Sequence, residues 1–141
     1  MDILIINGPN LNLIGERETG IYGNLSFNDY MEEIKKNYSQ HKISSFQSNI
    51  EGEIINRLQE ANLEVNAVIL NAGGYTHTSV AIADAIRAIE IPVVEVHISN
   101  LLSREAYRHV SIIGPACIGT IMGFGLESYR LAIESFTKRI F

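Results

Sequence analysis

The sequence has 141 residues and a mass of 15.7 kDa, which is the size of one ordinary domain. Apolar residues make up 46% and charged residues 19%, which excludes disordered and fibrous proteins, and no apolar run reaches the ~20 residues that span a bilayer. The net charge of −5 argues against a nucleic-acid scaffold, and the single cysteine, Cys117, excludes an intrachain disulfide framework.

Five short segments are rich in branched apolar residues, a composition typical of strands buried on both faces of a parallel sheet. In chain order they are Ile3–Ile6, Lys42–Gln47, Ala67–Leu70, Val93–Ile98 and Ile118–Met122. The start of the chain lacks the basic front and small-residue cleavage site of a signal peptide. We therefore expect a cytoplasmic protein with no membrane or nucleic-acid partner.

Segments of helical period lie between and after these strands. The first begins after Ser26, which is placed to cap it. The second covers Ile50–Ala61, the third runs from about Thr78 to Glu90, and the last begins near Leu126. This alternation predicts one α/β domain over residues 1–141, a flavodoxin-like three-layer sandwich whose five-stranded parallel sheet has helices on both faces.

Three of the expected strands end in unusual polar sequence. Asn7-Gly8-Pro9-Asn10 follows the first, Asn71-Ala72-Gly73-Gly74 follows the third, and Glu95 to Asn100 crosses the end of the fourth. Open α/β sheets bind ligands at the carboxyl ends of their strands, and buried polar groups are costly unless they are paired or used. The sequence therefore predicts a site at this edge.

A long loop, from about residue 10 to residue 24, follows the first strand and contains Arg17 and Tyr22. Long loops of this kind are often lids over active sites, although a plain surface connection with a solvated arginine is the alternative. Lowering a tyrosine pKa from about 10 to near 7 requires about 4 kcal/mol. A cation ~4 Å away supplies roughly that much, so Arg17 can make Tyr22 a usable base.

Two further pairs have spacings that suit a site. Glu95 and His97, two apart in a strand, point to the same side, so the carboxylate can orient the imidazole and make it a general acid. Arg104 and Arg108, four apart on an expected short helix, can both face one carboxylate or hydroxyl ligand. A satisfied structural histidine and exposed surface arginines are the alternatives.

The segment from Asn71 to Ser79 joins the third strand to the third helix. Its paired glycines let backbone approach a ligand, and either Thr76 or Ser79 can cap the helix. His77 and Asp84 are seven apart, which places them on one face of a continuous helix. A plain turn and a solvated acid are the alternatives.

Several well-known chemistries have no sequence signature here. The phosphate loop, the His-Glu-x-x-His zinc helix and the Gly-x-Ser-x-Gly elbow are all absent from the sequence, and the histidines show no ligand spacing. We expect a site that uses neither metal nor cofactor.

Taken together, the motifs resemble type II 3-dehydroquinate dehydratases over nearly the whole chain. The matching blocks are Ile6 to Asn12, Gly15 with Arg17-Glu18, Tyr22-Gly23, Asn71 to Gly74 with Thr76 to Ser79, Glu95 to Asn100, and Arg104-Glu105 with Arg108. Thr19 stands where the family often has proline. Ile50 replaces a frequent histidine, which we expect to affect packing rather than chemistry.

The resemblance implies a lyase that converts 3-dehydroquinate to 3-dehydroshikimate by anti elimination through an enolate, in the shikimate pathway. By matching position, Tyr22 is the base, Arg17 stabilises its charge, and His97 is the acid oriented by Glu95. Asn10 helps hold a water or hydrogen bond at the enolate oxygen. The expected substrate contacts are Asn71, His77, Arg108, the backbone of Ile98 and Ser99, and Asp84 from a neighbouring subunit.

The resemblance also implies a homododecamer, a tetramer of trimers. A catalytically silent metabolite-binding protein on the same fold is the alternative function. A pure binder has no use for a matched base and acid, so Arg17, Tyr22 and His97 favour the enzyme.

Overall fold

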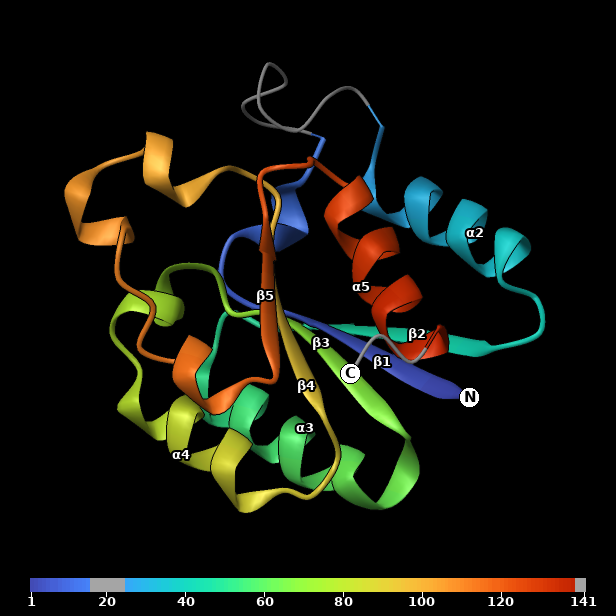
Figure 1. The fold of residues 1–141 in the computed structure, drawn as a ribbon, viewed down its shortest axis with the longest axis horizontal. Helices are drawn as coiled ribbons and strands as arrows, with labels where there is room; N and C mark the ends of the chain where they lie inside the picture. Colours follow the sequence, from blue (N-terminus) through green and yellow to red (C-terminus); the bar gives the residue numbers. More distant parts are fainter. Residues whose placement is uncertain (16–24, 139–141) are drawn as a thin grey trace.

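The computed structural model describes residues 1–15 and 25–138, and its centre is one parallel sheet of five strands (Figure 1). The order across the sheet is β2-β1-β3-β4-β5. The strands are β1 (Asp2–Asn7), β2 (Lys42–Gln47), β3 (Ala67–Asn71), β4 (Val93–His97) and β5 (Gly119–Met122). This is the strand order of flavodoxin-like folds, so the predicted architecture is confirmed.

Helices cover both faces of the sheet (Figure 1). On one face lie α2 (Phe27–Asn37) and α5 (Glu127–Thr137), and on the other lie α3 (Glu51–Glu64) and α4 (Val80–Ala88). Within the described residues, the helices are all too short or too polar to cross a membrane.

The central strands explain why the sequence shows apolar runs rather than alternation. Ile3 and Ile5 of β1 pack in the core under α2 and α5, while Leu4 and Ile6 pack in the core under α3 and α4. Successive side chains of a strand point to opposite faces, and both faces are covered here. Each position of β1 from Ile3 to Ile6 is therefore buried.

The start of α4 differs from the prediction. Thr78 is not helical, and Ser79 caps the helix because its Oγ accepts a hydrogen bond from the Ile82 N–H at 2.9 Å. His77 ends a separate 3-10 turn, Gly73–His77. The expectation that His77 and Asp84 share one face of a continuous helix is therefore wrong.

The strand order determines where a ligand can reach the sheet. After β1 the chain forms β2 on one side, and β3 then pairs with β1 on the other side. The segments that follow β1 and β3 lead to helices on opposite faces of the sheet, α2 and α4, so a crevice forms outside the ends of these strands. This switch point lies where the sequence places Asn10 and Asn71.

One tyrosine of α5 joins the two strands at the switch point. The Tyr129 hydroxyl donates to Asn7 Oδ1 at 2.7 Å and accepts from Asn71 Nδ2 at 3.0 Å. Tyr129 is fully buried, and so are both asparagines. The hydroxyl therefore satisfies polar groups at the ends of β1 and β3 at once.

We predict that Tyr129→Phe lowers the free energy of unfolding by about 2 kcal/mol, because two buried amide groups lose their partner. Urea unfolding at a fixed protein concentration measures the change. Tyr107→Phe is the matched control, because Tyr107 is exposed and the loss of its hydroxyl should change stability by less than about 0.5 kcal/mol. Equal effects of the two substitutions would contradict the prediction.

Candidate active site

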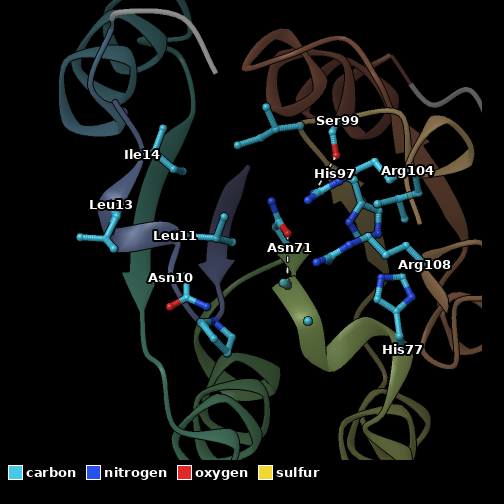
Figure 2. A pocket seen from close by; sticks show the side chains of 15 residues that line it. Asn10, Leu11, Leu13, Ile14, Asn71, His77, His97, Ser99, Arg104 and Arg108 are labelled. Atoms are coloured by element: carbon cyan, nitrogen blue, oxygen red, sulfur yellow. Dashed lines mark hydrogen bonds between the residues drawn. The ribbon is translucent and has the colours of Figure 1, made fainter. Parts of the chain in front are cut away.

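A cavity of about 280 Å³ opens at the carboxyl ends of β1, β3 and β4. Figure 2 shows Asn10, Leu11 and Ile14 on one side of it and His97, Arg104 and Arg108 on the other. Most of the residues predicted from the sequence line this cavity: Asn10, Asn71, His77, His97, Ile98, Ser99, Arg104 and Arg108. The apolar part of the wall comes from Leu11, Leu13, Ile14 and Leu101.

The predicted pairing of Glu95 with His97 is present in the structure. His97 Nε2 lies 2.6 Å from Glu95 Oε1, and both side chains are buried. Their spacing of two residues in β4 turns both side chains to the same face of the sheet. With Nε2 facing the carboxylate, Nδ1 is the ring nitrogen left for a ligand.

Glu95 has two further hydrogen-bond donors from other parts of the chain. Ser111 Oγ donates to Oε1 at 2.8 Å, and Thr120 Oγ1 of β5 donates to Oε2 at 2.8 Å. Gly114 closes over the same group, since a Cβ there would lie 2.7 Å from Glu95 Oε2. This is the close approach for which a glycine is required.

These contacts determine the charge of Glu95. Burial by itself raises the pKa of this carboxyl, but the hydrogen bonds and charge of His97, with the hydroxyls of Ser111 and Thr120, outweigh burial and hold its pKa below the ordinary value. Glu95 is therefore an anion in the folded protein at neutral pH.

Asn71 and His77 are oriented by bonds within the protein. Asn71 Oδ1 accepts from the Gly73 N–H at 3.2 Å, in addition to the bond from Nδ2 to Tyr129. His77 Nδ1 donates to the Val110 carbonyl at 2.8 Å. In the neutral ring Nε2 is then an acceptor, which suits a ligand hydroxyl.

The two arginines reach the cavity from separate turns, not from one helix as the sequence suggested. Arg104 follows the 3-10 turn Leu101–Ser103, and Arg108 ends the turn Ala106–Arg108. Arg108 Nε donates to Glu105 Oε2 at 2.8 Å, and Arg104 Nε lies 3.7 Å from the same oxygen. One carboxylate thus faces two guanidinium groups, which leaves an excess of positive charge at this wall.

One described residue among the predicted substrate contacts, Asp84, does not line this cavity. It is exposed on α4 with its Oδ1 3.7 Å from Arg87 Nη1. Arg17 and Tyr22 fall outside the described residues. Their assigned roles therefore remain predictions.

The residues that contact Glu95 and Asn71 and fix their positions were not predicted from the sequence. Ser111, Gly114 and Thr120 surround Glu95, and Tyr129 holds Asn71. None of the four belongs to a motif at a strand end, and the hydrogen bonds of Ser111, Thr120 and Tyr129 to the site join positions that are 16 to 122 apart. Only the fold brings them together.

The arrangement suits proton transfer to a small anionic ligand. Arginines attract a carboxylate, Asn71 and His77 offer hydrogen bonds to hydroxyls, and His97 presents a ring nitrogen backed by an anion. Among residues 1–15 and 25–138, His, Cys, Asp and Glu side chains form no cluster of three that could hold a metal ion.

Comparison with known proteins shows that the chain is similar to members of one family. The sequence model of "Dehydroquinase class II" matches residues 1–137. The 3-dehydroquinate dehydratase of Caldicellulosiruptor bescii is 52% identical over 139 residues, which are 96% of this chain and 96% of that protein.

Solved structures agree with the sequence matches. The type II dehydroquinase of Butyrivibrio crossotus has a TM-score of 0.91 and 43% identity and covers 97% of both chains. The type II dehydroquinase of Propionibacterium acnes has a TM-score of 0.92 and 33% identity, over 97% of this chain and 96% of that one. With the pocket at the switch point and the Glu95–His97 pair behind it, these matches establish that the chain belongs to the class II dehydroquinase family.

Proposed function

We propose that this chain is a 3-dehydroquinate dehydratase of the shikimate pathway, and that the cavity at the ends of β1, β3 and β4 is its active site. The observation that carries the proposal is the buried Glu95–His97 pair facing a cavity lined by arginines, in a chain of this family. A cyclic hydroxy acid that must lose a hydroxyl group needs an acid and an anion site together.

The reaction removes water from a β-hydroxy ketone. A base takes a proton from the carbon next to the carbonyl, and the electron pair of that C–H bond forms an enolate on the carbonyl oxygen. The enolate then returns its electrons, the C–O bond to the β-hydroxyl breaks, and the oxygen leaves as water after it receives a proton. The product, 3-dehydroshikimate, is a conjugated enone.

His97 supplies the proton to the leaving hydroxyl, and Glu95 orients the ring. Because Nε2 is held by the carboxylate, the proton leaves from Nδ1, the other ring nitrogen of a residue that lines the cavity.

Tyr22 is the base, used as a phenolate that Arg17 stabilises. This assignment rests on the family resemblance and on the Coulomb argument for one neighbouring cation. Asn10 lies at the end of β1 beside the cavity and helps stabilise the enolate oxygen. Arg108, His77, Asn71 and the backbone of Ile98 and Ser99 bind the carboxylate and hydroxyls of the substrate.

We further propose that residues 1–141 act as a single catalytic domain and that the active form is a cytoplasmic homododecamer, a tetramer of trimers. Asp84 then reaches the active site of a neighbouring subunit, in keeping with its exposure and its distance from the cavity of its own chain. Several large apolar side chains are exposed on the single chain and would be covered by assembly: Leu102 (64%), Tyr107 (66%), Val110 (70%) and Phe124 (63%).

The first test is turnover by the pure protein. We expect 3-dehydroquinate to give the ultraviolet absorbance of the conjugated enone, and Tyr22→Phe to lower kcat by roughly 10³-fold while substrate still binds, because the phenyl ring fills the space without an ionisable oxygen. Absence of the absorbance with wild-type protein, despite substrate binding, would indicate the silent binding protein instead. Full activity of Tyr22→Phe would reject Tyr22 as the base.

The second test concerns the charge of Glu95. Glutamine has nearly the same shape, and its amide oxygen can still accept the His97 bond. Glu95→Gln therefore removes the negative charge behind the ring and replaces one acceptor oxygen with an amide nitrogen. We expect kcat to fall roughly 10²-fold with KM nearly unchanged, since Glu95 lies behind His97. Steady-state kinetics measure both constants, and a change confined to KM would contradict this role.

The third test uses the Glu95→Gln variant to measure how the charge of Glu95 affects stability at different pH values. The pKa of Glu95 is lowered by folding, so its ionised form stabilises the protein above the unfolded pKa of about 4.3, and this contribution is lost as the pH falls through the lower folded pKa. The difference in unfolding free energy between wild type and Glu95→Gln should therefore shrink in acid. A pH-independent difference would show that the charge contributes nothing.

A further inference from the structure

Asn10 has an uncommon backbone conformation next to the cavity. Its φ of 68° makes it the one non-glycine residue with positive φ in residues 1–15 and 25–138. Asparagine tolerates this left-handed region better than most residues, but the conformation still needs support from its surroundings. The Asn10 side chain makes no capping bond to the turn Leu11–Leu13 that follows, so its amide remains available to the cavity.

The support comes from the end of β2. Asn49 Oδ1 accepts the Asn10 backbone N–H at 3.0 Å. Gln47 Nε2 donates to the same Asn49 oxygen at 3.1 Å and to the Gly8 carbonyl at 3.2 Å. One amide side chain thus orients another, and the pair holds the backbone on both sides of Pro9.

Asn49 is itself fixed to the loop after β3. The Tyr75 hydroxyl donates to the Asn49 carbonyl at 3.0 Å. The loops after β1 and β3 are also in direct contact, since a Cβ on Gly73 (φ 58°) would lie 3.0 Å from the Pro9 carbonyl oxygen. Asn49 therefore connects the three loops that determine where Asn10 sits relative to Asn71.

We propose that Asn49, oriented by Gln47, is a positioning residue for the dehydration. Its side-chain oxygen fixes the left-handed backbone of Asn10, and this backbone aims the Asn10 amide at the place where the enolate oxygen forms. Neither Asn49 nor Gln47 lines the cavity, so both act through Asn10. This inference rests on the proposed function and on the role given to Asn10 there.

The primary variant is Asn49→Ala, which removes the acceptor for the Asn10 N–H. We expect kcat to fall 10- to 100-fold with less than a threefold change in KM, because a small displacement of a stabilising group affects the transition state more than substrate binding. Asn49→Asp keeps an acceptor at the same place and should return kcat to within about fivefold of wild type. Asn37→Ala is the matched control, because Asn37 is exposed at the end of α2 and should leave both constants unchanged.

A double-mutant cycle with Asn10→Ala separates positioning from general loosening of the fold. If Asn49 acts through the Asn10 side chain, Asn49→Ala should cause no further loss of kcat once that side chain is gone. Multiplied losses, or wild-type kinetics of Asn49→Ala, would overturn the inference while leaving the dehydratase intact. Absence of turnover by the wild-type chain would overturn the proposed function and this inference with it.

Gln47→Met is a second variant that tests the same inference if Asn49→Ala does not fold. Methionine fills similar space but donates no hydrogen bond, so Asn49 loses its orienting partner and keeps its own acceptor. We expect a three- to tenfold loss of kcat with KM unchanged. Wild-type kinetics of this variant would contradict the role of Gln47, and a loss confined to KM would contradict positioning of the enolate site.

Discussion

A fully buried carboxylate can persist as an anion only where enough donors surround it, and Glu95 sets this requirement for the whole edge of the sheet. Its hydrogen-bond partners are His97 of β4, Thr120 of β5 and Ser111. The chain can pass this close to the carboxylate because Gly114 has no side chain. The charge of Glu95 thus helps to hold both β5 and the segment around Ser111 in place. That charge lies directly behind His97, the acid in the proposed mechanism.

The site combines side chains from strands that are distant in sequence but adjacent in the sheet. β1 and β3 approach at their carboxyl ends as closely as two backbones allow, since a Cβ on Gly8 would lie 2.5 Å from the Ala72 carbonyl oxygen. The first residues after each strand are packed closely against each other, as the approach of Gly73 to Pro9 also shows. A small molecule bound there meets polar groups that are already oriented, which lowers the entropic cost of forming the transition state.

The sequence predicted the features that depend on local pattern. Apolar runs such as Ile3–Ile6 indicated strands covered on both faces, and the strand ends indicated the edge where Asn10, Asn71 and His97 meet. It misjudged the segment before α4, because a helical spacing between His77 and Asp84 says nothing of the break at Thr78.

The residues that hold the site residues in position could not be predicted in the same way. Ser111, Thr120 and Tyr129 are ordinary hydroxyl residues in the sequence, and their importance comes from partners that only the folded chain brings near. Gln47 and Asn49 lie just before Ile50, the residue expected to affect packing. Ile50 is 58% exposed in the single chain, whereas its polar neighbours hold the loop that carries Asn10.

The bond from Tyr129 to both strand ends also has a bearing on the order in which the chain becomes native. During synthesis on the ribosome, Asn7 and Asn71 emerge well before α5, which carries their shared hydroxyl. Until α5 docks, the Asn7 and Asn71 side chains must bond to water in place of the Tyr129 hydroxyl. Water therefore stays at the junction of β1 and β3. Docking of α5 therefore completes the junction of β1 and β3.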